Sequence, residues 1–230
     1  MAIQAVLFDF SGTLFRLENE ASWLGGLMDD ATTPLDARAQ AELLHQLTVP
    51  TGPAIAGLGP DVQRAWQRRD LDPELHRTVY LAVIEAAGVR DRALAERIYE
   101  QMVDPANWVP YPDAVAVLRR LSEAGLAVGV VSNIAWDIRQ SLDEHGASGY
   151  VDEVVMSYQV GAVKPEPEIF RLACARLGVA PEHALMVGDS AEADGGAAAV
   201  GCAVALVEPL PTAQRPDGLV AALTARGVLR

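Results

Sequence analysis

Residues 3–15 read IQAVLFDFSGTLF, a short apolar run followed at once by a polar turn. The apolar residues of 3–8 are typical of a strand buried inside a parallel sheet. The run ends at Asp9, so the strand stops where a carboxylate begins a loop. Gly12 and Thr13 follow in a tight turn, whose backbone amides can hold an anion. This stretch therefore predicts a buried strand that ends at a functional loop.

The second half of the chain alternates between apolar runs and amphipathic stretches. Strand-like runs lie at residues 127–131, 151–156, 184–187 and 204–207. Helical patterns lie at 112–125, 137–145 and 167–178, and in the Ala-rich stretch before the last run. Such alternation predicts an α/β fold, a Rossmann-like parallel sheet core with helices on both faces.

Residues 16–108 have a different character. Amphipathic helical patterns occur at about 35–47, 74–87 and 91–103, and no strand pattern is convincing. We therefore expect a Rossmann-like core formed by residues 1–15 and 109–230, with an all-helical domain inserted at 16–108.

Composition limits the classes of partner. The 230 residues are 50% hydrophobic and carry a net charge of −13, which suits a globular protein and disfavours nucleic acid and anionic membranes as partners. No apolar run approaches the ~20 residues of a membrane span, and the N-terminus lacks a basic leader. We expect a cytoplasmic protein that acts on a small molecule. Its two cysteines, Cys174 and Cys202, are expected to be small buried residues.

Polar residues stand where the predicted strands end. Asp9 follows the first, Ser132-Asn133 the second and Gly188-Asp189 the fourth, while Lys164 lies in the loop after the third. Because ligands bind at the carboxyl ends of parallel strands, these residues should converge on one site. Lys164 is the only lysine in the chain, which favours a functional role in a loop expected to be exposed.

Four segments in this order resemble the motifs of the haloacid dehalogenase superfamily. They are Asp9 to Phe15, Val131-Ser132-Asn133, Lys164-Pro165 and Gly188 to Asp194. The resemblance covers the predicted core, and the helical insertion occupies the place of that family's cap.

The resemblance implies a role for each motif residue. It makes Asp9 the nucleophile of a covalent mechanism and Lys164 its charge partner. Ser132 donates to a substrate oxygen, and Gly12, Thr13 and Asn133 complete the substrate site. A small phosphorylated molecule is the implied substrate, and Mg²⁺ the implied cofactor. Its implied ligands are Asp9, the Ser11 backbone carbonyl and Asp189, with Asp194 close by.

One residue departs from the family's phosphatase pattern. These phosphatases usually have an acid–base aspartate two residues after the nucleophile, and here that catalytic position is Ser11. The leading interpretation is a Mg²⁺-dependent phosphatase that turns over slowly, unless Glu18 or Glu20 supplies the acid–base group. A 2-haloacid dehalogenase and a weakly catalytic binding protein that keeps the fold are the alternatives. Retention of Asp189 and Asp194 argues against both.

Overall fold

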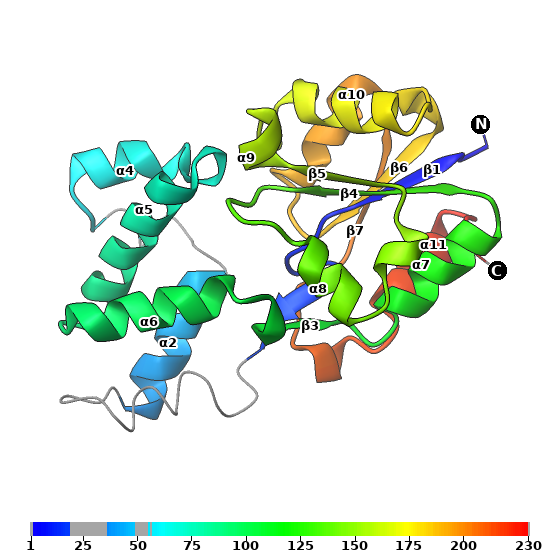
Figure 1. Cartoon of the computed structure of the whole chain (residues 1–230). Helices are drawn as coiled ribbons and strands as arrows, with labels where there is room; N and C mark the ends of the chain where they lie inside the picture. Colours follow the sequence, from blue (N-terminus) through cyan, green and yellow to red (C-terminus); the bar gives the residue numbers. More distant parts are fainter. Residues whose placement is uncertain (1, 19–35, 49–54, 56, 230) are drawn as a thin grey trace. The chain divides into compact units, whose positions relative to one another are not determined.

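The computed structural model describes residues 2–18, 36–48, 55 and 57–229 (Figure 1). The chain divides into two compact units. One comprises Met1–Arg16 and Trp108–Arg230, and we call it the core unit. The other comprises Leu17–Asn107, and we call it the inserted unit.

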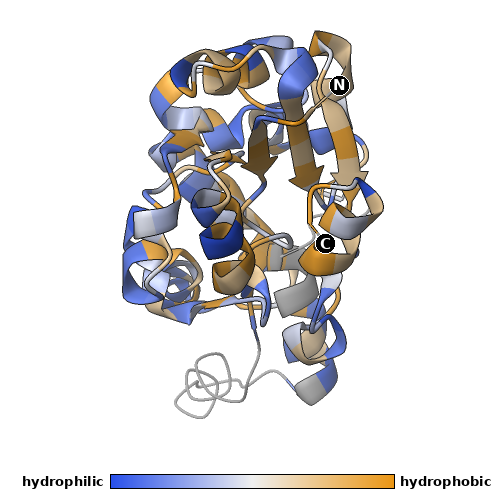
Figure 2. Ribbon diagram, turned by 90° about the vertical axis from the view of Figure 1, so that its right-hand side faces the viewer, coloured by the Kyte–Doolittle hydropathy of each residue, from blue (hydrophilic) through white to orange (hydrophobic). Residues whose placement is uncertain are grey.

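A five-stranded parallel sheet forms the centre of the core unit, with strand order β5-β4-β1-β6-β7. The strands are β1 (Ala5–Phe8), β4 (Ala127–Ser132), β5 (Glu153–Met156), β6 (Ala184–Gly188) and β7 (Ala203–Leu206). Every residue of β1 is buried, as expected of a strand with neighbours on both edges and helices on both faces. Figure 2 shows the hydrophobic colouring of the strands. The predicted parallel α/β fold is confirmed.

Helices cover both faces of this sheet, with α10 (Pro167–Arg176) on one side and α7 (Ala114–Glu123) and α11 (Gly218–Ala225) on the other (Figure 1). Ile169, Phe170 and Ala173 of α10 are buried in the core. The remaining helices of the unit are shorter: α8 (Arg139–Glu144), α9 (Ser157–Val160), η3 (Ser148–Tyr150), η4 (Pro181–His183), η5 (Asp194–Val200) and η6 (Thr212–Gln214). Cys174 and Cys202 are both free and buried, as predicted.

The Ala-rich stretch is a 3₁₀ helix, η5, where an ordinary helix was predicted. It contains Gly195-Gly196, and glycine disfavours the α-helix. A Cβ at Gly196 would lie 2.5 Å from Cβ of Pro165, so this segment packs directly on the Lys164-Pro165 loop. That close approach depends on tertiary packing, which the alanine-rich sequence does not reveal.

Two three-residue strands, β2 (Phe15–Leu17) and β3 (Trp108–Pro110), pair with each other where the chain passes between the units. We did not predict them, because three residues are too few to show an alternating pattern of apolar and polar residues.

The described part of the inserted unit is helical. Its elements are α2 (Ala37–Thr48), α4 (Pro60–Trp66), η1 (Arg69–Leu71), α5 (Pro73–Ala86), α6 (Arg92–Val103) and η2 (Pro105–Asn107). The Asp72 side chain caps α5 by accepting from Leu75 N–H, and Asp91 caps α6 in the same manner. Helix α4 was not predicted, since it is short and follows a Pro/Gly-rich stretch. Within the described residues, each helix is too short or too polar to cross a membrane.

Candidate active site

The carboxyl ends of the central strands bring the predicted residues together. Asp9 directly follows β1, Ser132 is the last residue of β4, and Asp189 directly follows β6. Since β4, β1 and β6 are parallel neighbours, these ends lie along one edge of the sheet. The backbone fixes Asp9 there, because its N–H donates to Val187 O at 2.9 Å.

Lys164 is buried between two of the carboxylates. Its Nζ donates to Asp9 Oδ1 at 2.5 Å and to Asp194 Oδ1 at 2.7 Å. The residue is only 5% exposed, although Pro165 and Glu166 in the same loop are exposed. Burial lowers the pKa of Lys164, but the charges of Asp194 and Asp9 outweigh it and raise the pKa above its usual range. Lys164 is therefore a permanent positive charge.

Asn133 holds the backbone of Lys164 in place. Its Oδ1 accepts from Lys164 N–H at 2.7 Å, and its Nδ2 donates to Lys164 O at 2.9 Å. We predicted Asn133 among the substrate-binding residues. In the structure both polar ends of its amide contact the lysine backbone, so the side chain orients the loop that carries the site's ammonium group.

Asp194 is fully buried and bonded on both oxygens. Oδ1 accepts from Lys164, and Oδ2 accepts from Ser190 N–H at 2.9 Å. A Cβ at Gly188 would collide with the Asp194 carboxylate, so the glycine that ends β6 leaves room for it.

Three carboxylates converge around this single lysine. Oxygen atoms of Asp9, Asp189 and Asp194 all lie within 4.8 Å of one another. Burial raises the pKa of Asp9 to about 7, with Lys164 opposing and the other two aspartates adding to the rise. Burial and the charge of Asp194 raise the pKa of Asp189 to about 6, again opposed by Lys164.

This donor set fits a hard divalent cation. Mg²⁺ prefers carboxylate and carbonyl oxygens, and three negative charges against one positive charge favour its binding. A cation among these groups would also lower their pKa values and keep them ionised. Three of the four predicted metal residues are thus brought together. The fourth, Ser11, is in the turn after Asp9 and forms a β-bridge with Phe15.

The turn after Asp9 packs tightly against Asp189. Gly12 has a φ of 78°, in the left-handed region that favours glycine. Gly12 N–H donates to Phe15 O at 2.7 Å, and Leu14 N–H to Phe10 O at 3.0 Å. Thr13 is fully buried, and its hydroxyl finds no hydrogen-bond partner within the described residues.

The sequence did not reveal one neighbour of this turn, Arg215. Its buried guanidinium donates to the carbonyl oxygens of Gly12 and Thr13. No motif spacing links residues so distant in sequence, and no pattern in the sequence could have indicated the contact.

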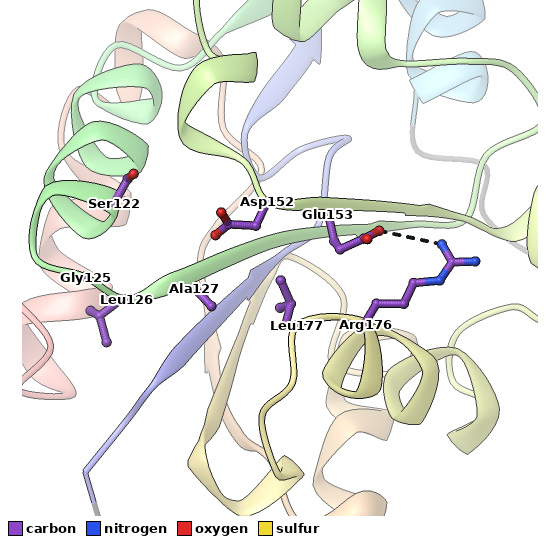
Figure 3. Close-up of a pocket in the computed structure, with 8 residues that line it drawn as sticks. All are labelled: Ser122, Gly125, Leu126, Ala127, Asp152, Glu153, Arg176 and Leu177. Atoms are coloured by element: carbon purple, nitrogen blue, oxygen red, sulfur yellow. Dashed lines mark ion pairs between the residues drawn. The ribbon is translucent and has the colours of Figure 1, made fainter.

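A surface pocket of about 430 Å³ lies at the opposite end of the strands (Figure 3). Its lining includes Ala127, where β4 begins, and Glu153, where β5 begins. Glu153 pairs there with Arg176 at 3.7 Å. None of the predicted site residues lines this pocket, so it is separate from the carboxylate cluster.

The fold and the motif residues agree with the comparison to known families. Residues 3–201 match the haloacid dehalogenase-like hydrolase family, and the chain belongs to that family. The predicted superfamily is confirmed.

Two curated relatives are phosphatases by name. A phosphoserine phosphatase of Thermus thermophilus is 36% identical over 125 residues, 53% of this chain and 49% of that protein. A glyceraldehyde 3-phosphate phosphatase of Methanopyrus kandleri is 42% identical over 86 residues, 37% of each chain. The chain thus matches half or less of the length of these two relatives.

A solved structure shows the same fold. The L-2-haloacid dehalogenase of Xanthobacter autotrophicus superposes with a TM-score of 0.66 over 95% of this chain and 83% of that chain, at 24% identity.

Proposed function

We propose that this protein is a Mg²⁺-dependent phosphatase that acts on a small phosphorylated metabolite through Asp9. The contact between Lys164 and Asp9, beside Asp189 and Asp194, carries the proposal. It joins the buried Asp9 carboxylate, the positive charge of Lys164 and a group of carboxylates that suits Mg²⁺ in one cluster. The phosphatase names of two relatives support the same reaction class.

In the proposed reaction an Asp9 carboxylate oxygen attacks phosphorus, and the bond from phosphorus to the leaving oxygen breaks. Water then attacks the phosphorus of the aspartyl-phosphate, which releases phosphate and restores the carboxylate. Lys164 holds the Asp9 oxygen and offsets the negative charge that the phosphoryl group brings. Asn133 keeps that lysine in place through its backbone. Bound Mg²⁺, held by the carboxylates, would supply further neutralisation of phosphoryl charge.

Ser11 limits the proposed turnover. A hydroxyl is a weak acid and base near neutral pH, so it protonates the leaving alkoxide poorly and activates water poorly. We propose slow hydrolysis that favours aryl and acyl phosphates, whose leaving groups need little protonation. We also propose that the inserted unit is the cap that selects the substrate. Glu20 lies outside the described residues.

The dehalogenase alternative differs in whether the site needs a metal ion. A halide substrate brings no phosphate dianion against Asp9, so it needs no metal. The likeness to the Xanthobacter enzyme concerns the fold alone. The cluster of Asp189 and Asp194 beside Asp9 favours the phosphatase.

The test is a screen of phosphorylated metabolites and p-nitrophenyl phosphate with Mg²⁺, read as released phosphate. Asp9→Asn should abolish release, and chelator should stop it until Mg²⁺ is restored. Mg²⁺ at ~100 times its Kd should raise the free energy of unfolding by about 2.7 kcal/mol. This gain should disappear in Asp189→Asn and persist in Asp137→Asn, a half-exposed surface control. Full activity after metal removal, or chloride release from 2-chloropropionate, would favour the dehalogenase.

A further inference from the structure

The side chain of Arg215 reaches from the segment between β7 and α11 to the turn that follows the proposed nucleophile. Its Nη1 donates to Gly12 O at 2.7 Å, and its Nη2 donates to Thr13 O. The residue is only 5% exposed. We infer that Arg215 is a positioning residue, which holds the Gly12-Thr13 turn in the geometry that catalysis by Asp9 requires. The inference rests on the proposed phosphatase function.

Arg215 is itself held rigidly. Its guanidinium lies over the ring of Tyr111, with 3.1 Å between Cζ and the ring centroid. Tyr111 OH donates to Leu210 O at 2.8 Å, and Tyr111 N–H donates to Leu14 O at 2.9 Å. A planar guanidinium can stack flat on a ring while its two terminal nitrogens donate to separate carbonyls, and the compact ammonium group of lysine does not reproduce this geometry. The contact therefore requires arginine and not positive charge alone.

Holding these two carbonyls fixes the orientation of the turn. Each carbonyl shares a planar trans peptide with the next N–H, so the Gly12 and Thr13 carbonyls determine where the amides of Thr13 and Leu14 point. Gly12 has no side chain to anchor it, and its backbone packs against Asp189. Arg215 supplies that anchor from outside the turn.

A small movement of this turn would change the site directly. The turn begins three residues after Asp9, and its Gly12 packs against the Asp189 carboxylate. Misplacement of reacting groups by about 1 Å can cost on the order of 10²-fold in rate. Loss of Arg215 should therefore reduce the rate of the chemical step more than it reduces substrate binding.

The test compares Arg215→Lys with Asp113→Asn. Asp113 Oδ2 accepts from Leu219 N–H at 2.8 Å and Val220 N–H at 3.0 Å, so it holds the same C-terminal segment without contacting the turn. With p-nitrophenyl phosphate and Mg²⁺, Arg215→Lys should lower kcat by about 10- to 100-fold and leave KM nearly unchanged. Inhibition by orthovanadate, which mimics the transition state, should weaken in parallel, while inhibition by inorganic phosphate should not. Asp113→Asn should keep kcat close to wild type.

Hydrogen exchange of the peptide that covers residues 10–16 gives a second readout, independent of turnover. Its amides should exchange faster in Arg215→Lys and remain protected in Asp113→Asn. Wild-type kcat and exchange in Arg215→Lys would overturn the inference, as would an equal loss of kcat in Asp113→Asn. A wild type that releases no phosphate from any probe overturns the proposed function instead. The exchange comparison would then still decide whether Arg215 holds the turn.

Discussion

Gly12 and Asp189 lie so close that a Cβ added to the glycine would be 2.5 Å from Asp189 Oδ2. The backbone of the turn after β1 therefore packs against a side chain of the loop after β6. Residue 12 thus meets two separate requirements: its backbone needs a positive φ, and the contact with Asp189 leaves no room for a side chain.

Alanine substitutions at Gly12 and at a control glycine distinguish these two requirements. Gly12→Ala should destabilise the protein through its φ of 78°, at a cost of about 1–2 kcal/mol, and should also displace Asp189. Gly125→Ala is the matched control, because Gly125 has a φ of 75° and nothing within 4 Å of its added Cβ. Thermal unfolding and phosphate release would be measured for both. Only Gly12→Ala should lose activity, and equal activity in the two variants would contradict the role of this contact.

Removal of the lysine charge should affect both stability and rate. Lys164→Met leaves Asp9 and Asp194 buried without their partner, which should cost about 3–5 kcal/mol at pH 8. The loss should shrink as the pH falls, because burial raises the pKa of Asp9 and its protonation removes one of the unpaired charges. Phosphate release should fall by about 10²-fold or more.

The control for this variant is Arg139→Met. It breaks a half-exposed pair with Asp137 and should change the unfolding free energy by less than about 1 kcal/mol. Urea unfolding at pH 8 and pH 5 measures both variants. A Lys164→Met protein as stable and active as wild type would mean that the buried pair is dispensable.

A carboxylate at position 11 should restore acid–base catalysis. A positioned acid–base group contributes about 10²–10⁴ in rate, so Ser11→Asp should speed hydrolysis of alkyl phosphates by at least about tenfold. In the wild type, phosphorylated Asp9 should accumulate during turnover of an aryl phosphate, because serine activates water poorly. Intact-mass spectrometry and phosphate release measure these effects, with Ser11→Asn as the uncharged control. Fast alkyl phosphate turnover by wild type would direct attention to Glu18 or Glu20.

His76 should make the inserted unit sensitive to acid. Burial, aided by the charge of Arg69, lowers the pKa of His76 to about 3, and its Nδ1 lies 2.9 Å from Tyr99 OH. The unfolded chain binds a proton near pH 6.5, whereas the folded chain does not until about pH 3. Stability present above pH 6.5 is therefore lost as pH falls, by about 2 kcal/mol at pH 5.

The measurement is urea unfolding at pH 7.5 and pH 5. His76→Gln should remove about 2 kcal/mol of the difference between the two pH values, whatever its effect at pH 7.5. His183→Gln is the control, on a partly exposed histidine of the core unit. An unchanged pH dependence in His76→Gln would show that another group causes the acid sensitivity.

Much of the core fold could be predicted because its strands are continuous apolar runs that end on polar residues. The motif residues at those ends, Asp9, Ser132 and Asp189, could be placed at one edge from strand order alone. The burial of Lys164 could not, since it depends on two carboxylates that come from distant loops. The 3₁₀ form of η5 depends on its packing against Pro165, and the Arg215 contact joins segments without any shared pattern. Local sequence thus specified the elements, and tertiary packing specified the distances.

The position of β1 in the sheet affects how the polypeptide folds during its synthesis on the ribosome. Ala5 pairs with Ala127 on one side and Ala184 on the other, so the first strand emerges long before either neighbour exists. During synthesis this apolar segment stays unpaired, and an unpaired apolar strand promotes aggregation. Long-range closure of this kind is also slow. We therefore expect nascent chains that stop short of β6 to depend on chaperones, and Asp9 to reach its position beside Lys164 only late in translation.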